Sequence, residues 1–206
     1  MFLQFDCIIT TNWDTLAERI LLKHKKWHPS EGYGFQVPLV EDIEDNNLQL
    51  ISLHSDIKIL KLHGSIGWHE KNETLYLSQP KFLQYLLGHD IRDQNAPRVG
   101  SGPDENPLIL KPSYLKQLDH PTLLSIWDQA RLNLEKASSI TIVGYSLPKA
   151  DVAIRALLLP IRNSESSIRI INPFQMKDDF KKRWEDFFKP GKLPIFENQR
   201  ASEYFI

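Results

Sequence analysis

The sequence predicts an α/β domain built on a doubly wound, mostly parallel sheet. Five short runs rich in Ile, Leu and Val each end in a polar or turn residue, and helical patterns lie between them. The runs are continuously apolar, which is typical of strands covered by helices on both faces. Strands that alternate with helices indicate a layered α/β fold. With 206 residues, the chain has the size of one domain with its own core.

The predicted strands and the first helix follow directly from this pattern. The strands cover residues 5–11, 56–63, 106–113, 138–146 and 166–173. Apolar residues at helical spacing begin at Leu16, and Asp14 is a candidate N-cap for that helix. The polar stretch 88–107 is rich in Gly, Pro, Asp and Asn, which predicts a long exposed loop and not a domain boundary.

Capping residues and apolar stripes mark the other helices. Ser78 can cap a helix that Gly88 ends. Asp151 can cap a short helix that Pro160 ends. Two stripes at helical spacing predict buried helix faces, which we interpret as core and not as a ligand site. Their members are Leu123, Trp127, Ala130, Leu134 and Ala137 in one helix, and Met176, Phe180, Trp184 and Phe188 in the other.

Composition argues against several classes of protein. The formal net charge of -1 lacks the basic excess of proteins that bind nucleic acid through its phosphates. No run approaches the ~20 apolar residues of a membrane span, and the N-terminus lacks a signal-peptide pattern. We therefore expect a cytoplasmic protein without membrane or direct nucleic-acid partners. Cys7 is the single cysteine and the histidines lack paired spacing, so we predict no disulfide, zinc or other metal.

Polar residues follow all five predicted strands, and in a doubly wound sheet ligands bind beyond the carboxyl ends of the strands. Each residue also has a purely structural interpretation. Asn12 and Asp14 are common in turns and caps, His63 can be a buried histidine, and Ser146 can close a tight turn. The five ends are Thr11–Asp14, His63–Ser65, Lys111–Ser113, Gly144–Pro148 and Asn172–Pro173.

Taken in order, these strand ends resemble the bacterial sirtuin-like NAD-binding domains, especially those of anti-phage NAD-hydrolysing systems. The resemblance runs from about Ile8 to Pro173. It implies a Rossmann-like, sirtuin-type fold in one domain over 1–206, with a small aromatic and helical insert at about 66–106. The motifs that carry it are ITTNWD, KLHGSIGW, LILKPS, VGYSLPKAD and IRIINP.

The resemblance implies catalytic roles for two residues. Asn12 matches the asparagine beside the nicotinamide ribose, and His63 matches the catalytic histidine. Cleavage of the nicotinamide–ribose bond creates positive charge at the anomeric carbon. An amide can hold a water or a ribose hydroxyl there, and a histidine can take a proton from either. Thr11 and Asp14 belong to the same turn as Asn12, and Asp14 matches the aspartate that shapes the nicotinamide pocket.

The resemblance also implies a cradle for the rest of NAD. Gly144, Tyr145 and Ser146 match the turn that lines its phosphates and ribose, and Asn172 matches the asparagine near the adenosine ribose. We expect backbone N–H groups of the turn to bind the pyrophosphate as a helix N-terminus does.

The sequence departs from the family pattern in two places. Deacylases of this superfamily carry a four-cysteine zinc ribbon, whereas Cys7 is the only cysteine here. The family's domain also begins one βα unit earlier, with a Gly-rich loop that cradles the pyrophosphate. The chain begins at the next strand and lacks this loop, so we expect either an N-terminally incomplete copy or a protein without this half of the cofactor cradle.

These features favour an NAD glycohydrolase of anti-phage defence, with NAD as substrate and no zinc. A homo-oligomer or a companion defence protein is the expected partner. The alternative is a catalytically degenerate module for nucleotide sensing or protein interaction. A protein deacylase is third, because the zinc ribbon is absent from the sequence.

Overall fold

The structure is a computed structural model that describes residues 6–35, 39–40, 55–71, 74–78, 107–110, 120–173 and 178–200. It divides into two compact units. The first unit comprises residues 4–112 and 118–127, and the second comprises 1–3, 113–117 and 128–206. Both are mixed α/β structures with open sheets that contain parallel strands, which confirms the predicted fold class.

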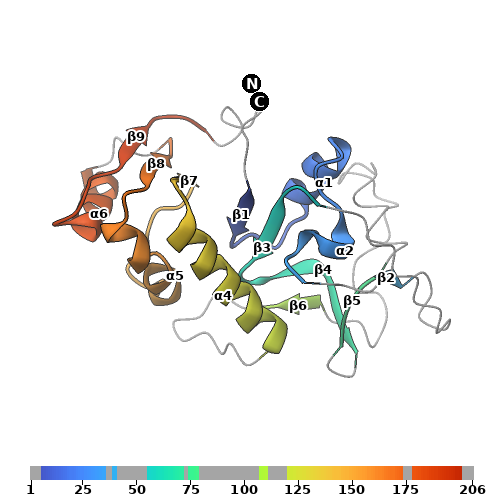
Figure 1. The fold of residues 1–206 in the computed structure, drawn as a ribbon. Helices are drawn as coiled ribbons and strands as arrows, with labels where there is room; N and C mark the ends of the chain where they lie inside the picture. The colour runs from blue at the N-terminus through green and yellow to red at the C-terminus, as the bar shows by residue number, and fades with distance from the viewer. Residues whose placement is uncertain are drawn as a thin grey trace. The chain divides into compact units, whose positions relative to one another are not determined.

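The first unit contains a parallel pair of strands, whose carboxyl ends lead into Thr11–Asp14 and His63. Strand β1 (Cys7–Thr10) pairs in parallel with β3 (Lys58–Lys61), and Thr10 lies opposite Lys61. Helices α1 (Leu16–Lys23) and α2 (Pro29–Gly32) follow β1 in the sequence and lie beside β3 in Figure 1. Both predicted strands are therefore confirmed.

A second sheet of the first unit is mostly antiparallel, in order β2-β5-β4-β6. Its strands are β2 (Leu39–Val40), β4 (Gly64–Lys71), β5 (Thr74–Ser78) and β6 (Pro107–Ile109). The prediction that 106–113 belongs to the parallel sheet is wrong, because β6 pairs antiparallel with β4. Ser78 ends strand β5, and the predicted helix and loop that follow it lie outside the described residues.

Aromatic side chains form much of the first unit's core. Trp27, Tyr33 and Trp68 are all buried. Tyr33 meets Trp27 edge-on at a ring-centroid distance of 4.9 Å and Trp68 at 5.0 Å, a geometry that aromatic rings favour. These contacts join the segments on either side of α2 to strand β4.

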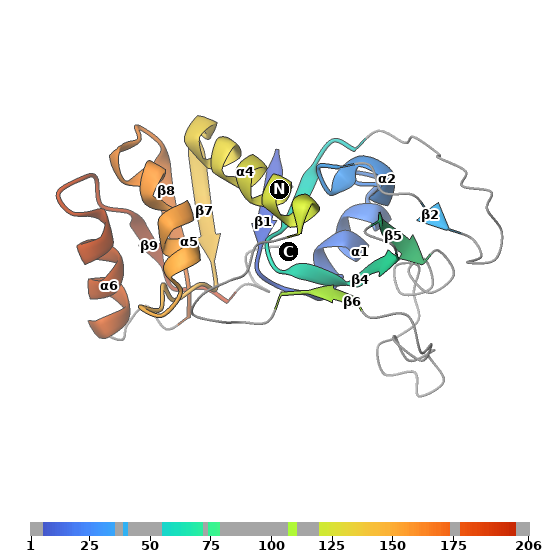
Figure 2. The same ribbon diagram turned by 90° about the horizontal axis from the view of Figure 1, so that it is seen from below.

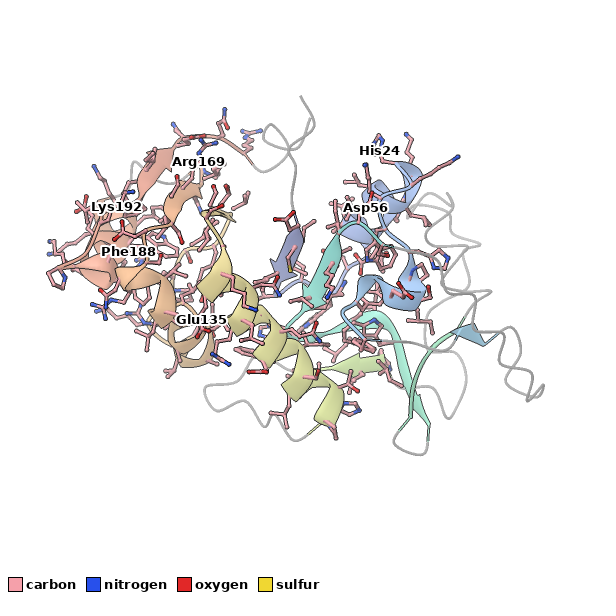
Figure 3. The ribbon with its side chains drawn as sticks, in the orientation of Figure 1. His24, Asp56, Glu135, Arg169, Phe188 and Lys192 are labelled. Carbon is pink, nitrogen blue, oxygen red and sulfur yellow. The ribbon has the colours of Figure 1, made fainter. Side chains whose placement is uncertain are left out.

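The second unit is built on three parallel strands in order β7-β8-β9. They are β7 (Ser139–Val143), β8 (Ser167–Ile171) and β9 (Ile195–Glu197). Figure 2 shows α5 (Val152–Leu157) and α6 (Asp178–Phe188) along this sheet. Arg169, labelled in Figure 3, pairs with Glu197 of β9 at 3.0 Å.

Most of the stripe residues that the structure describes are buried, as predicted. In α4 (Pro121–Lys136), Leu123, Ala130 and Leu134 are buried, whereas Trp127 is half-buried and Ala137, also half-buried, lies just beyond the helix. In α6, Phe180, Trp184 and Phe188 are buried, whereas Met176 lies outside the described residues.

Two helix boundaries differ from the prediction. Helix α5 ends at Leu157, before Pro160, which instead lies at the start of a 3-10 helix over Leu159–Asn163. Thr15, not Asp14, is the residue before α1. The Asp14 carboxylate still accepts the Leu16 N–H at 2.9 Å, so it caps the helix from one position further out. Among the described helices, none combines the length and the apolar character that crossing a bilayer requires.

Candidate functional site

The parallel pairing of β1 and β3 brings Asn12 and His63 to the same edge of the first unit. Leu62 N–H continues the ladder by donating to the Thr10 carbonyl at 2.9 Å. After these strands the backbone leaves the sheet, at Thr11–Asp14 beyond β1 and at His63–Gly64 beyond β3. Asn12 is exposed and Thr11 is half-buried, whereas His63 is 7% exposed.

Contacts on both sides fix the turn Thr11–Asp14. Asn12 N–H donates to the Thr10 hydroxyl at 3.0 Å. The Trp13 carbonyl accepts from Ile66 N–H at 3.1 Å and from the Ser65 hydroxyl at 3.5 Å. The exposed Asn12 amide therefore projects from a well-anchored backbone, as a ligand-binding side chain must.

Gly64 explains why a glycine follows His63. Its φ is +80°, and a Cβ there would lie 2.0 Å from the Leu108 carbonyl oxygen. Only glycine fits both the backbone conformation and this close approach. The His63 carbonyl accepts from Leu110 N–H at 2.9 Å, so β6 holds the histidine backbone in place.

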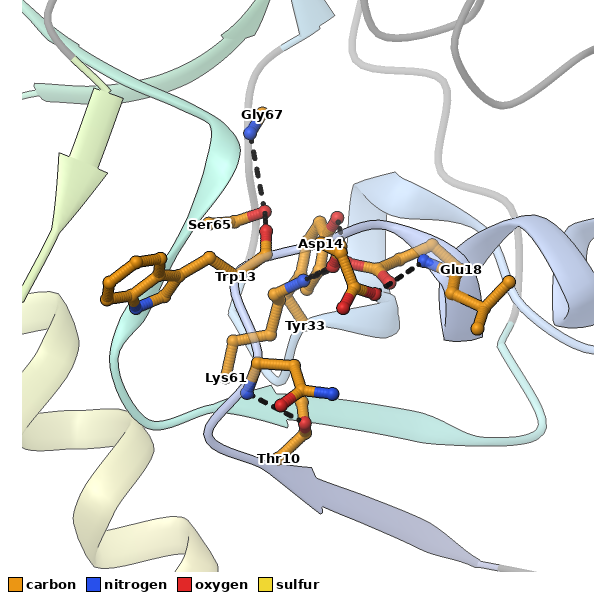
Figure 4. Close-up of polar contacts among 10 residues, drawn as sticks. Thr10, Trp13, Asp14, Glu18, Tyr33, Lys61, Ser65 and Gly67 are labelled. Atoms are coloured by element: carbon orange, nitrogen blue, oxygen red, sulfur yellow. Dashed lines mark hydrogen bonds and ion pairs between the residues drawn. The ribbon is translucent and has the colours of Figure 1, made fainter. Parts of the chain in front are cut away.

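A buried ion pair lies beneath the turn (Figure 4). Lys61 Nζ is 2.7 Å from Glu18 Oε1, and both side chains are 1% exposed. Lys61 Nζ also donates to the Asp14 carbonyl. The Tyr33 hydroxyl donates to Glu18 Oε1 at 3.2 Å. Lys61, Glu18 and Tyr33, which we call the buried triad, thus join β3, α1 and the end of α2 to the turn.

Electrostatics of the buried triad are governed by desolvation and by its internal charges. Burial raises the pKa of Glu18, and the Lys61 ammonium group opposes that rise. Burial, and then the Glu18 charge, raise the pKa of Tyr33 well above its usual value. Glu18 Oε2 has no hydrogen-bond partner among the described residues. The buried negative charge of the Glu18 carboxylate is therefore compensated mainly by the Lys61 ammonium group.

The second unit brings Gly144 and Asn172 to the ends of adjacent strands. Val143 pairs with Ile171, and Gly144 N–H donates to the Ile171 carbonyl at 2.9 Å. Asn172 is 4% exposed, and its N–H donates to the Glu197 carbonyl at 3.1 Å. Gly144 has a φ of +73°, and a Cβ at this position would meet no described atom within 4 Å. Backbone conformation, and not crowding, favours glycine there.

Two side-chain hydrogen bonds hold the turn after β7 in place within the second unit. The Tyr145 hydroxyl donates to Asp151 Oδ2 at 2.9 Å, and Asp151 Oδ1 accepts from Ile154 N–H at 3.4 Å, which confirms Asp151 as the cap of α5. Arg183 Nε donates to the Ser146 carbonyl at 3.2 Å. Tyr145 therefore uses its hydroxyl within the protein.

The structure limits which groups of the turn after β7 are available to a phosphate. Helix α5 begins at Val152, several residues after Ser146, so the turn is not itself a helix N-terminus. The Gly144 N–H is already used inside the sheet. A phosphate would therefore have to be bound by groups of the turn other than that amide and other than a helix end.

Sequence reasoning missed the buried triad. The available signal was Lys61, a lysine inside an apolar run and flanked by Leu60 and Leu62. A lysine in such a strand can also extend its ammonium group to solvent. The sequence therefore did not distinguish a buried lysine from one that reaches solvent. Within the described residues, no group of three or more His, Cys, Asp or Glu side chains could hold a metal ion.

Comparison with known proteins gives one family and several weak structural likenesses. The family model for the SIR2-like domain matches residues 6–186. No curated protein matches the sequence. A structure from a study of sirtuin substrate affinity is 17% identical with a TM-score of 0.41, and the match covers 93% of this chain and 69% of that chain.

Two Sir2 structures described with a p53 peptide and NAD are similar at the same level. One is 18% identical with a TM-score of 0.39, covering 90% of this chain and 65% of that one. The other, a mutant, is 16% identical with a TM-score of 0.39, covering 91% and 65%. The chain thus spans about two thirds of the length of these structures.

Proposed function

This chain belongs to the SIR2-like domain family, and on that basis we propose that it binds NAD and hydrolyses it to nicotinamide and ADP-ribose. One observation carries the proposal: the exposed Asn12 and His63 follow paired parallel strands at the same edge of the sheet. This is where an open α/β fold binds its ligands.

The proposed reaction takes place at the anomeric carbon of the nicotinamide ribose. It needs a polar group that holds a water beside this carbon and a group that accepts a proton from that water. The bond between nicotinamide nitrogen and the anomeric carbon breaks, and its electron pair leaves with nicotinamide. A water then bonds to the carbon and loses a proton. The Asn12 amide can hold that water without being protonated, and His63 can accept the proton, because imidazole ordinarily titrates near neutral pH.

The remaining site residues are proposed to hold the rest of the substrate. Asp14 would shape the nicotinamide pocket beside Thr11. Asn172 would bind the adenosine ribose, and the turn Gly144–Ser146 would line the phosphates. The open space around Gly144 is compatible with a nucleotide approaching the backbone closely.

The test is release of nicotinamide from NAD by the purified protein, followed by chromatography. We expect turnover by wild type and a loss of at least ~100-fold in Asn12→Ala, a scale typical of positioned acid–base and polar groups. Asn12 is exposed, so this variant should fold normally. A constant NAD concentration at high protein concentration would refute the proposed reaction. Turnover that requires an acetylated peptide would instead indicate a deacylase.

The burial of His63 favours a second candidate, a module that binds a nucleotide without cleaving it. At 7% exposure, the ring offers little surface to a substrate. Calorimetric titration with NAD distinguishes the two candidates. Heat of binding without nicotinamide release supports the sensing module, and binding with release supports the hydrolase.

The proposed biological role is anti-phage defence in the bacterial cytoplasm, with a homo-oligomer or a companion defence protein as partner. Phage infection of bacteria that express the chain should then lower cellular NAD, and Asn12→Ala should prevent the fall. Unchanged NAD in infected cells that carry wild-type protein would refute this role, whatever the activity in vitro.

A further inference from the structure

We propose that Lys61 is a positioning residue for the turn that carries Asn12. Its ammonium group fixes the Asp14 peptide, while Glu18, which also accepts from the Tyr33 hydroxyl, holds that ammonium group in place. The consequence for catalysis rests on the proposed function. The consequence for the order of the turn does not, because it can be measured without NAD.

The contacts of Lys61 connect the interior of the unit to the site's backbone. Its Nζ lies 2.7 Å from Glu18 Oε1 and donates to the Asp14 carbonyl, two residues after Asn12. The side chain is 1% exposed, so water cannot substitute for either partner. An ammonium group has three donors and no acceptor, and at least two of the three serve this junction.

The turn is therefore held through two consecutive carbonyl groups. Trp13 accepts from Ile66 N–H at 3.1 Å, and Asp14 accepts from Lys61. Asn12 itself is exposed. Its amide therefore takes its place from the backbone and not from packing of its own side chain.

A role in stability alone does not account for this arrangement. Well-packed apolar residues usually stabilise a fold as well as a buried ion pair does, because charges lose hydration on burial. Leu60 and Leu62, which flank Lys61, are themselves buried. A third apolar residue would thus suit the strand, but it could not donate to the Asp14 carbonyl.

The decisive experiment separates the turn from the fold with a paired substitution. Lys61→Met with Glu18→Leu removes both charges, so no buried charge remains without its partner. We expect the midpoint of thermal unfolding to stay within about 5 °C of wild type, since such replacements are often neutral. Amide hydrogen exchange without NAD then reports the turn residue by residue.

In the double variant we expect exchange at the Ile66 amide to accelerate at least tenfold. The Leu62 amide, which donates to Thr10 in the β1–β3 ladder, should keep its protection. If wild type hydrolyses NAD, kcat should fall on the order of 100-fold, because small misplacements near the reacting atoms have effects of that size. Lys26→Met, which removes an exposed partner of Asp56, is the matched control and should change neither readout.

Two outcomes would overturn the proposal. Wild-type protection at Ile66 in a folded double variant would show that the turn does not depend on Lys61. Unfolding of the double variant would show that the pair holds the fold and not the turn specifically. Absence of NAD turnover in wild type would refute the proposed reaction only, because the exchange measurements would still decide the role of Lys61.

Discussion

The turn after β1 and the turn after β7 both follow parallel strands, but buried charged groups hold the first and partly exposed side chains hold the second. The first is anchored from below by the buried triad, whose lysine and glutamate are 1% exposed. The second is held by Tyr145, Asp151 and Arg183, which are all partly exposed. A buried charge cannot replace its partner with water, whereas a partly exposed hydroxyl can. The first turn should therefore be the more rigid and the more sensitive to substitution.

The largest expected effect comes from breaking the buried triad. Glu18→Leu leaves the Lys61 ammonium group buried without its carboxylate, so we expect the free energy of unfolding to fall by roughly 3–5 kcal/mol. Urea denaturation followed by tryptophan fluorescence measures this loss. Asp56→Asn, in the exposed pair with Lys26, should change it by less than about 0.5 kcal/mol. A loss below about 1 kcal/mol in Glu18→Leu would remove the contrast between the two turns.

Alanine at Gly64 and at Gly144, which both have positive φ, compares the two regions directly. Gly64→Ala brings a Cβ to 2.0 Å from the Leu108 carbonyl oxygen, so a steric term of about 1–3 kcal/mol adds to a backbone term of about 1–2 kcal/mol. Gly144→Ala meets nothing within 4 Å and should lose the backbone term alone. Equal losses in the two variants, measured by the same urea titration, would contradict this difference.

An alkaline titration tests whether the fold also suppresses ionisation of the Cys7 thiol in β1, the strand that leads into the first turn. Burial raises the pKa of the Cys7 thiol from 9.0 to about 11, and the Lys58 charge opposes the rise. Between these values the unfolded chain loses the thiol proton before the folded chain does. Stability therefore falls as pH rises from 9 to 11, by up to about 2 kcal/mol, and Cys7 contributes no pH dependence below that window.

The measurement is the urea midpoint at several pH values for wild type and Cys7→Ala. All other groups titrate in both proteins, so the difference between their curves isolates Cys7. Parallel curves from pH 9 to 11 would show that the thiol is not protected from ionisation by the fold.

The smallest expected effect lies in the turn after β7. Tyr145→Phe removes the hydroxyl that donates to Asp151 at 2.9 Å, which should lower the free energy of unfolding by roughly 0.5–1.5 kcal/mol. Ser146→Ala is the control, because Arg183 holds the backbone carbonyl of Ser146, which this variant keeps. A loss in Tyr145→Phe as large as that in Glu18→Leu would mean that the two turns are anchored equally well.

Local patterns predicted the strands around the site because each is a short apolar run that ends in a polar residue. The segments that became β1, β3, β7 and β8 were all expected. The buried faces of α4 and α6 were also expected, because their apolar residues repeat at helical spacing.

What the sequence did not reveal are the features that depend on partners distant in the chain. The antiparallel pairing of β6 depends on β4, which lies in another part of the sequence. The ion pair of Lys61 joins residues 43 positions apart, and a strand lysine that reaches solvent has the same local pattern. Leu147 has a backbone φ of 52°, a left-handed conformation that leucine rarely adopts, and no local pattern indicated it.

The surroundings of the two glycines also bear on sequence variation among relatives. At position 144 the requirement is one of backbone torsion, which asparagine and aspartate meet more readily than other residues with a side chain. At position 64 the carbonyl oxygen of Leu108 occupies the space of any Cβ, so asparagine or aspartate cannot replace glycine there. Homologous chains that keep this architecture should therefore be invariant at the first glycine and show Gly, Asn or Asp at the second.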